Sequence, residues 1–352
     1  MLSPSSGFRQ ATPGYGYQFP LDHGTHDAYQ TEWWYFTGHL TTESGRRFGY
    51  QVTFFRRGLD ADTVRTNPSR WALHHLYLAH AALSDLQGDR FHFAEKLSRA
   101  GIGKAGADPG RLHVWIDRWS LEATAPDHRR HRLRVAADGF TLELILTAEK
   151  PPVIHGQDGI SRKSAAGEQA SHYYSITRLA TEGTVEVQGQ RHTVTGLSWM
   201  DHEFGSGDLG DGLVGWDWFS IQLDTQQDLM LYLLRHADGT PDPASSGTLV
   251  APDGHPRHLR HDDVSVTVLG HWTSSASGTR YPSGWRLAVP SQDLTLDLHP
   301  LLDDQELITA RSTQVTYWEG AVRVSGVQRG RTVTGQGYVE LTGYAEPFRH
   351  VK

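Results

Sequence analysis

The chain contains no cysteine among its 352 residues. This absence excludes disulfide bonds, thiolate-ligated metal centres and cysteine nucleophiles. No apolar run approaches the roughly 20 residues of a membrane-spanning helix, so no membrane span is expected. Lysine and arginine number 33 against 40 aspartates and glutamates, which gives a net charge of -7. Because the basic residues form no cluster, the sequence argues against a nucleic-acid partner.

The N-terminal residues contain no apolar signal core. The expected compartment is the cytoplasm, or the periplasm or exterior if a targeting segment was removed before residue 1. A lack of cysteine does not choose between them, since secreted proteins can also lack it. The mean hydropathy of -0.49 is typical of a soluble globular protein. Nothing in the sequence indicates the oligomeric state.

Aromatic residues, histidine and glycine are abundant, with 11 Trp, 13 Tyr, 12 Phe, 21 His and 37 Gly. Apolar and polar residues alternate in several segments, which is the pattern of a strand with one buried face. Turn-forming residues separate these segments. The sequence therefore predicts an all-β fold of antiparallel barrels or sandwiches with little helix. Residues 90–100 are the best helical candidate, although their first half also fits a strand. The alternating segments are residues 141–146, 264–268, 294–298 and 321–326.

A faint internal repeat predicts two domains. Residues 33–40 and 216–223 are both Trp-rich and both lead through a turn into a second apolar strand. Repetition near half the chain length indicates a duplicated unit of roughly 150–180 residues. We expect a flexible segment (1–20), a first domain (21–182) and a second domain (183–352). The small and polar residues 156–169 are expected to form a loop over a site or to begin the domain connection.

Glu32 lies beside a Trp pair on a predicted strand. Alternation sends Glu32 and Trp34 to one face, with Trp33 and Tyr35 on the other. If the first face lines a barrel interior, burial would raise the pKa of Glu32 and make it a proton donor near neutrality. The alternative is a structural glutamate bonded to a neighbouring arginine.

Two other segments carry candidate ligand contacts. His74 and His80 share one face of a predicted strand but lie roughly 20 Å apart, too far to ligate one metal. His74 is therefore a candidate for a polar barrel lining, or an ordinary hydrogen-bonded histidine. His172 and Tyr174 also share a face, and neutral donors of this kind orient a carbonyl or hydroxyl on an apolar ligand. A Tyr-rich sheet surface explains them equally well.

The densest group of titratable residues is Asp201, His202 and Glu203, followed by the glycine-rich residues 205–215. Adjacent residues on a strand face opposite ways, but at a strand end or bulge Asp201 and His202 can converge. They would then supply a general acid and its orienting partner. The alternative is a hydrogen-bond network between domains. No phosphate loop, nucleophile elbow or HExxH motif is present.

The chain carries six ordered motifs, at residues 31–35, 74–75, 198–205, 215–218, 317–320 and 337–344. Together they resemble the AttH-like branch of the carotenoid 1,2-hydratase superfamily. The resemblance runs from about residue 20 to residue 345 and implies two packed lipocalin-like (calycin) β-barrels. The superfamily includes carotenoid hydratases, kievitone hydratase, fungal Diels–Alderases and bacterial proteins without an assigned reaction.

The resemblance to the carotenoid hydratases also suggests site residues. It implies that His202 corresponds to their motif histidine, that Phe204 stands where they have a tryptophan, and that Tyr232 corresponds to a later tyrosine. Their aspartate has no counterpart, because Leu233 and Leu234 follow Tyr232. This departure argues against carotenoid hydration itself.

Acid-assisted addition of water to an alkene would suit such a scaffold. It needs an acid kept protonated by burial, an aromatic wall that stabilises a cation, and a positioned water. No metal or organic cofactor is needed. Candidate acids are Glu32, Asp201 and Asp217, candidate wall residues are Trp34, Trp216 and Trp218, and candidate water-holding residues are His202 and Tyr174.

The sequence therefore favours a cofactor-independent hydratase or lyase, or a related isomerase or cyclase, acting on a hydrophobic terpenoid- or polyketide-like molecule. A non-catalytic lipocalin-like carrier of such a ligand uses the same cavity and stays open as the alternative. A hydrolase has little support, because no serine triad is visible.

Overall fold

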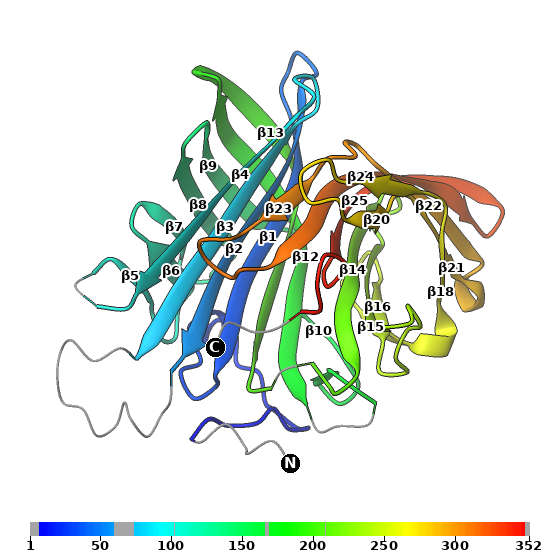
Figure 1. The fold of residues 1–352 in the computed structure, drawn as a ribbon, viewed down its shortest axis with the longest axis horizontal. Coiled ribbons are helices and arrows are strands. Elements are labelled where there is room, and N and C mark those ends of the chain that lie inside the picture. Colours follow the sequence, from blue (N-terminus) through cyan, green and yellow to red (C-terminus); the bar gives the residue numbers. More distant parts are fainter. Residues whose placement is uncertain (1–6, 60–73, 102, 166–168, 208, 349–352) are drawn as a thin grey trace.

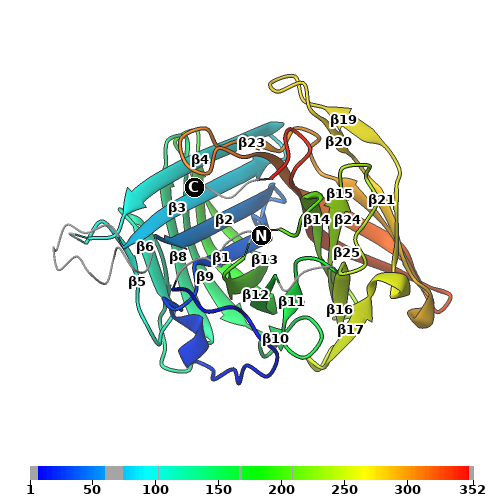
Figure 2. The same ribbon diagram turned by 60° about the horizontal axis from the view of Figure 1, so that its bottom comes forward.

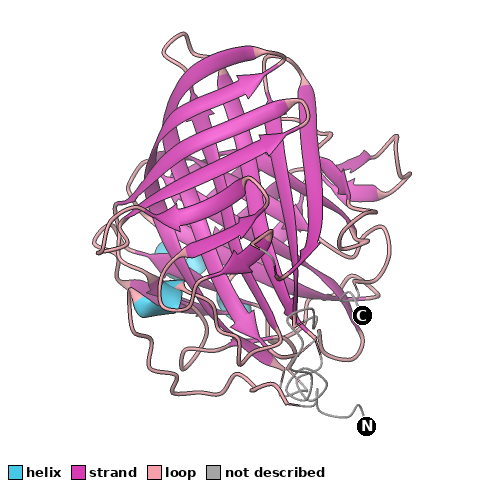
Figure 3. Ribbon diagram, turned by 90° about the vertical axis from the view of Figure 1, so that its left-hand side faces the viewer, coloured by secondary structure: helices cyan, strands magenta, loops and turns pink. Residues whose placement is uncertain are grey.

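The computed structural model describes residues 7–59, 74–101, 103–165, 169–207 and 209–348. Nearly all regular structure within these ranges is β-strand (Figure 3). The only helices in this part of the chain are short 3₁₀ turns: η1 (Leu21–His23), η2 (His261–Asp263) and η3 (Pro290–Gln292). The prediction of an all-β fold is confirmed.

The first sheet contains β1 to β13 and curls into a nearly closed barrel (Figure 2). Lys96 of β4 donates to Asp117 beside β6 at 2.7 Å, where the two ends of the sheet approach each other. The strands are β1 (Thr31–Thr41), β2 (Arg47–Gly58), β3 (His75–Asp85), β4 (Arg90–Arg99), β5 (Ala105–Ala107), β6 (His113–Ile116), β7 (Trp119–Ala123), β8 (Arg130–Ala137), β9 (Phe140–Ala148), β10 (Val153–Ile154), β11 (Ser161–Arg162), β12 (Ala170–Val187) and β13 (Gln190–Gly205).

The second half of the chain forms a ten-stranded antiparallel sheet and a separate hairpin, β19–β20 (Figure 1). Its strands are β14 (Leu213–Leu223), β15 (Asp228–His236), β16 (Ser246–Val250), β17 (Pro256–Arg260), β18 (Ser265–Val268), β19 (His271–Thr273), β20 (Arg280–Pro282), β21 (Trp285–Val289), β22 (Leu294–Pro300), β23 (Glu306–Ile308), β24 (Thr316–Gln328) and β25 (Arg331–Leu341).

Residues 90–100, the helical candidate, form the strand β4 instead. β4 pairs with β3 along its whole length, and Phe91 and Phe93 lie two residues apart, as the strand period requires. The helical interpretation was wrong because pairing with β3 holds the whole segment extended from Arg90 to Arg99.

The two sheets begin in the same way. β1 pairs with β2 and with the last strand of its sheet, β13, and β14 pairs with β15 and with the last strand of its sheet, β25. The predicted boundary between residues 182 and 183 falls inside β12. The chain leaves the first sheet later, between β13 and β14, because β12 and β13 form a hairpin that stays in the barrel wall.

Each sheet encloses its own hydrophobic core, and a third cluster lies between the sheets. The barrel core includes Trp34 and Trp119, and the second core includes Trp285. Tyr35, Trp199 and neighbouring residues form the cluster between the sheets. None of the helices in the described ranges is long and apolar enough to cross a membrane.

Glycine allows close approach of the two sheets at one point. A Cβ atom added to Gly49 of β2 would lie 2.6 Å from the Cβ atom of Ala321 on β24. Only a residue without a side chain fits there, because carbon atoms in van der Waals contact are about 3.5–4.0 Å apart. β2 and β24 therefore hold the sheets against each other.

Candidate functional site

The pairing of β1 with β13 sorts their side chains into two chemically different groups. Tyr35 lies opposite Asp201, and Trp34 lies opposite His202. Residues paired across a sheet point to the same face. Trp34 and His202 therefore point into the barrel, whereas Tyr35 and Asp201 point toward the second sheet.

A cavity of about 190 Å³ lies between the sheets. The barrel contributes outward-facing side chains of β1, β2, β3, β12 and β13, and the second sheet contributes β14, β15, β24 and β25. The lining is largely apolar and aromatic, which suits a small organic ligand. Among its residues are Trp33, Tyr35, Phe55, Tyr173, Trp216, Trp218 and Tyr232.

Asp201 accepts three side-chain hydrogen bonds at the cavity wall. Its Oδ2 accepts from the Tyr173 hydroxyl at 2.7 Å, and its Oδ1 accepts from the Trp199 indole at 2.6 Å and from Ser175. The indole of Trp218, on the second sheet, donates to the Tyr173 hydroxyl at 3.0 Å. The network therefore joins the acid to both walls of the cavity.

All three donors to Asp201 are neutral, so no cation compensates its burial. Burial raises the pKa of Asp201 to about 7, against the lowering effect of the hydrogen bonds. A carboxyl group with this pKa is available as a proton donor near neutral pH.

Three further carboxyl groups line the cavity. Glu203 pairs with Lys163 at one wall, and the Lys163 ammonium also lies 5.9 Å from the centre of the Trp33 ring. Glu319 and Glu340 face each other across the β24–β25 pair. Burial raises the pKa of Glu340 to about 7, and burial together with the neighbouring Glu340 raises the pKa of Glu319 well above its usual range.

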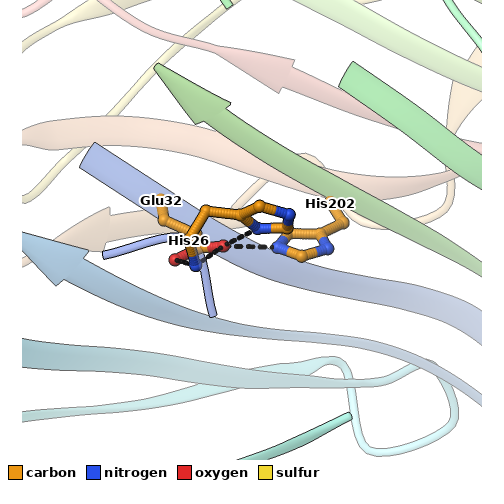
Figure 4. A group of neighbouring side chains, drawn as sticks. All are labelled: His26, Glu32 and His202. Atoms are coloured by element: carbon orange, nitrogen blue, oxygen red, sulfur yellow. Dashed lines mark hydrogen bonds and ion pairs between the residues drawn. The ribbon is translucent and has the colours of Figure 1, made fainter. Parts of the chain in front are cut away.

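The other face of β1 and β13 contributes to a polar cluster in the barrel (Figure 4). Glu32 accepts from Arg56 Nε at 2.9 Å and from His26 Nδ1 at 2.7 Å, and it lies 2.9 Å from His202 Nε2. Tyr174 bonds the other ring nitrogen of His202 at 2.8 Å. None of Glu32, His202 and Tyr174 lines the cavity between the sheets.

The expectation that burial raises the pKa of Glu32 is wrong. Burial does act in that direction, but Arg56, His202 and His26 together hold the pKa well below its usual range. Glu32 is therefore ionised and bonded to an arginine, which is the structural alternative from the sequence.

His26, Glu32 and His202 lie close enough together to ligate one metal ion, but their ligand atoms are engaged by other groups. The Glu32 oxygens already accept from Arg56, from Thr25 and from the His26 backbone N–H. The carboxylates of Asp22 and Glu32 raise the pKa of His26 to about 9, despite its burial. A metal ion there would have to displace the proton of His26 and compete with Arg56 for the Glu32 carboxylate.

The N-terminal segment closes this part of the barrel. The Tyr15 ring lies 4.4 Å from the ring of His172, and the His26 ring stacks on Phe204 at 3.6 Å. Residues 15–26, partly expected to be flexible, are thus packed on the barrel. His172 and Phe204, predicted ligand contacts, touch this segment rather than the cavity between the sheets.

Asp201 and His202 do not converge. β13 pairs with β1 and β12 without a bulge at residues 200–205, so the two side chains keep opposite faces. His202 therefore does not orient Asp201. Asp217 also lies away from the cavity, on the opposite face of β14 from Trp216 and Trp218. There it accepts from the Tyr344 hydroxyl at 3.0 Å and lies 3.4 Å from Arg235 Nε, and burial raises its pKa to about 6.

The predicted residues thus divide between two places. Asp201, Trp216, Trp218 and Tyr232 line the cavity. Trp34 lies in the barrel core, and His74 is half-buried outside the lining. His80 of the same segment does line the cavity, with its two ring nitrogens bonded to Tyr317 at 2.8 Å and Ser312 at 2.9 Å.

Sequence reasoning missed Tyr35, Tyr173, Glu319 and Glu340 as site residues. A signal was present for the two glutamates, because each is the acidic residue of an otherwise apolar or aromatic motif, residues 317–320 and 337–344. Which face of β1 meets a cavity could not be read from the alternation alone.

A barrel and a second sheet enclosing an aromatic cavity define a two-domain, lipocalin-like β-protein. The chain belongs to the AttH-like family, whose model matches residues 10–344. The resemblance expected from the motifs is confirmed. A search of curated proteins finds no significant match.

Solved structures share the fold. A Nitrosomonas europaea protein assigned to AttH is 36% identical, with a TM-score of 0.85, and the alignment covers 96% of this chain and 99% of that chain. Kievitone hydratase from Nectria haematococca is 17% identical, with a TM-score of 0.71 and coverage of 97% and 98%. CghA is 14% identical, with a TM-score of 0.54 and coverage of 91% and 90%.

Proposed function

We propose that this protein is a cofactor-independent enzyme of the hydratase or lyase type that acts on a hydrophobic ligand in the cavity between the sheets. The observation that carries the proposal is a buried acid, Asp201, with a pKa raised to about 7 in an aromatic cavity. Of the four predicted catalytic residues, Asp201 alone lines this cavity, so the proposal relies on it.

The reaction would begin with transfer of the Asp201 proton to one carbon of a C=C bond, which leaves a cation on the other carbon. The faces of Trp216 and Trp218 would stabilise that cation. A water molecule then adds to the cation and returns a proton to the Asp201 carboxylate. The reverse sequence removes water from an alcohol.

The fold shared with kievitone hydratase supports this reaction class. A terpenoid- or polyketide-like ligand fits the apolar lining. Carotenoids are not favoured, because Leu233 and Leu234 follow Tyr232 where the carotenoid hydratases have an aspartate.

Uptake of labelled water tests the proposal. The purified protein is incubated in H₂¹⁸O with a panel of isoprenoid and polyketide alkenes, and products are analysed by mass spectrometry. We expect one or more of them to gain a labelled water. Asp201→Asn should lower the rate by at least about 100-fold, the usual contribution of a general acid.

Asp297→Asn is the matched control, because this half-buried aspartate of β22 pairs with the exposed Arg286 of β21 outside the cavity. It should keep the full rate. A panel in which no compound takes up water, or an Asp201→Asn variant as active as the control, would contradict the proposal.

A non-catalytic carrier is the second candidate. Both oxygens of Asp201 already accept hydrogen bonds, as expected if the residue only joins the walls of the cavity. A carrier would retain a hydrophobic ligand through purification and release it chemically unchanged, which native mass spectrometry detects.

A further inference from the structure

Two polar groups that line the cavity have no hydrogen-bond partner within the described residues. They are the Tyr35 hydroxyl on β1 and Oε1 of Glu319 on β24. Tyr35 is 7% exposed and Glu319 is 1% exposed. Buried polar groups almost always have partners, so two unpaired groups in one cavity indicate that a partner comes from outside the chain.

Both groups are hydrogen-bond donors. Glu319 lies directly opposite Glu340, and two buried carboxylates at this separation cannot both be ionised. Burial and Glu340 raise the pKa of Glu319 well above its usual range, which favours its protonated form, a hydrogen-bond donor. Burial likewise raises the pKa of Tyr35, which keeps its hydroxyl proton.

The two donors come from opposite walls but lie near each other. The two side chains lie close enough that an interaction between them contributes to the pKa of each, yet the Tyr35 hydroxyl and Glu319 Oε1 do not reach full hydrogen-bond geometry with each other or with any other described residue. The Trp218 ring stands edge-on to the Tyr35 ring, with centres 5.1 Å apart. A flat ligand beside Trp218 would therefore bring an acceptor atom within reach of both donors.

The charge around the site selects against anions. The lining holds the carboxyl groups of Asp201, Glu203, Glu319 and Glu340. Its three cationic side chains are already engaged. Arg56 pairs with Glu32 at 2.9 Å, Lys163 pairs with Glu203, and Arg57 donates to Thr31 at 2.7 Å. A ligand carboxylate would meet acids rather than a cation.

We propose that Tyr35 and Glu319 form a two-donor subsite that binds the carbonyl or hydroxyl oxygen of an uncharged aromatic ligand. The inference rests on the proposed function only in taking the cavity between the sheets as the ligand site.

Three probes of the same size test the subsite by titration calorimetry: 2-acetylnaphthalene, 2-ethylnaphthalene and 2-naphthoate. The ketone should bind about fivefold to tenfold more tightly than the hydrocarbon, as expected for added hydrogen bonds. The carboxylate should bind most weakly. Tyr35→Phe and Glu319→Leu should each reduce the preference for the ketone.

Glu319→Gln keeps a hydrogen-bond donor of similar shape but removes the carboxyl group. Because the amide N–H still donates to the ketone, the preference for the ketone should persist. The controls are Tyr50→Phe, which removes a buried hydroxyl inside the barrel, and Glu143→Gln on the exposed face of β9. Both should keep the preference. If Glu319→Leu does not fold, Tyr35→Phe and Glu319→Gln still decide the question.

Equal affinities for ketone and hydrocarbon, or no binding of any probe, would overturn the subsite. So would a ketone preference that survives in Tyr35→Phe, or naphthoate as the tightest probe. Failure of the proposed reaction is distinguishable, because it would leave the ketone preference intact while no alkene takes up labelled water.

Discussion

Asp201 and Glu32 are both buried carboxyl groups, but their partners give them opposite protonation states. Glu32 lies 2.9 Å from a guanidinium nitrogen of Arg56, and its pKa is held well below the usual range. Asp201 has only neutral donors, and burial raises its pKa to about 7. Burial alone therefore does not determine the protonation state of a carboxyl group; the presence or absence of a compensating cation does.

The raised pKa of Asp201 predicts a dependence of stability on pH. The protonated carboxyl contributes stability that is fully present below its unfolded pKa of 3.8 and is lost as the pH rises through about 7. Asp201→Asn should therefore lose less stability between pH 5 and pH 7 than the unmodified protein, by at most about 1.4 kcal/mol per pH unit. Urea denaturation followed by tryptophan fluorescence measures both slopes. Identical slopes would contradict the pKa.

β13 separates two kinds of chemistry by strand alternation. Its outward side chains face the cavity, and its inward side chains join the charged cluster that holds the N-terminal segment. Glu32 of β1 is the centre of that cluster, since Arg56, His26 and His202 all bond it. The cluster is thus a structural feature of the barrel, adjacent in sequence to the site but on the other face.

Removing the central carboxylate should destabilise the barrel. Glu32→Ala leaves Arg56 buried without its partner, which typically costs about 3–5 kcal/mol. The loss is measured by urea denaturation at pH 6. The protonated His26, with a folded pKa of about 9, contributes stability below its unfolded pKa of 6.5 that disappears as the pH rises through 9. The loss of stability as the pH rises through 9 should be smaller in Glu32→Ala, because His26 then lacks one of its two carboxylate partners.

The exposed pair of Glu143 and Arg191 provides the control, because exposed ion pairs contribute about 0–1 kcal/mol. A Glu32→Ala variant no less stable than Glu143→Ala would show that the cluster does not hold the barrel.

The cavity depends on contacts that fix the position of the second sheet relative to the barrel. Besides the apolar cluster, a buried ion triad joins them: Asp228 of β15 lies 2.7 Å from Lys150 Nζ and 2.7 Å from Arg178 Nη2. Lys150 and Arg178 belong to the barrel half of the chain, and each is less than a tenth exposed. The position of the second sheet against the barrel therefore depends in part on the Asp228 carboxylate.

Asp228→Ala should leave two buried cations unpaired and lower the free energy of unfolding by about 3–5 kcal/mol. We also expect the two sheets to unfold in separate steps, visible as non-coincident fluorescence and circular-dichroism transitions. Asp297→Ala, which breaks the exposed pair with Arg286, should keep a single transition. A single transition of unchanged midpoint in Asp228→Ala would exclude this role.

The ordered motifs were enough to identify the family, and local pattern was enough to predict the all-β class. It was also enough to place Glu32 with Trp34 and Trp33 with Tyr35 on opposite faces, because alternation is a property of each strand by itself. Four of the residues singled out in the sequence line the cavity: Asp201, Trp216, Trp218 and Tyr232. The first three lie in motifs rich in tryptophan and acids, whereas Tyr232 was suggested by the family resemblance.

Only the tertiary structure decided which face of β1 and β13 meets the cavity. Packing of the second sheet against the barrel places Tyr35 and Asp201 at the cavity and brings Glu319 and Glu340 to them from far along the chain. The same packing leaves Glu32 and His202 with Arg56 inside the barrel. The pKa of a side chain and the lining of a cavity both depend on neighbours in space. Those neighbours lie on other strands, and a local sequence pattern does not determine how distant strands pair and pack.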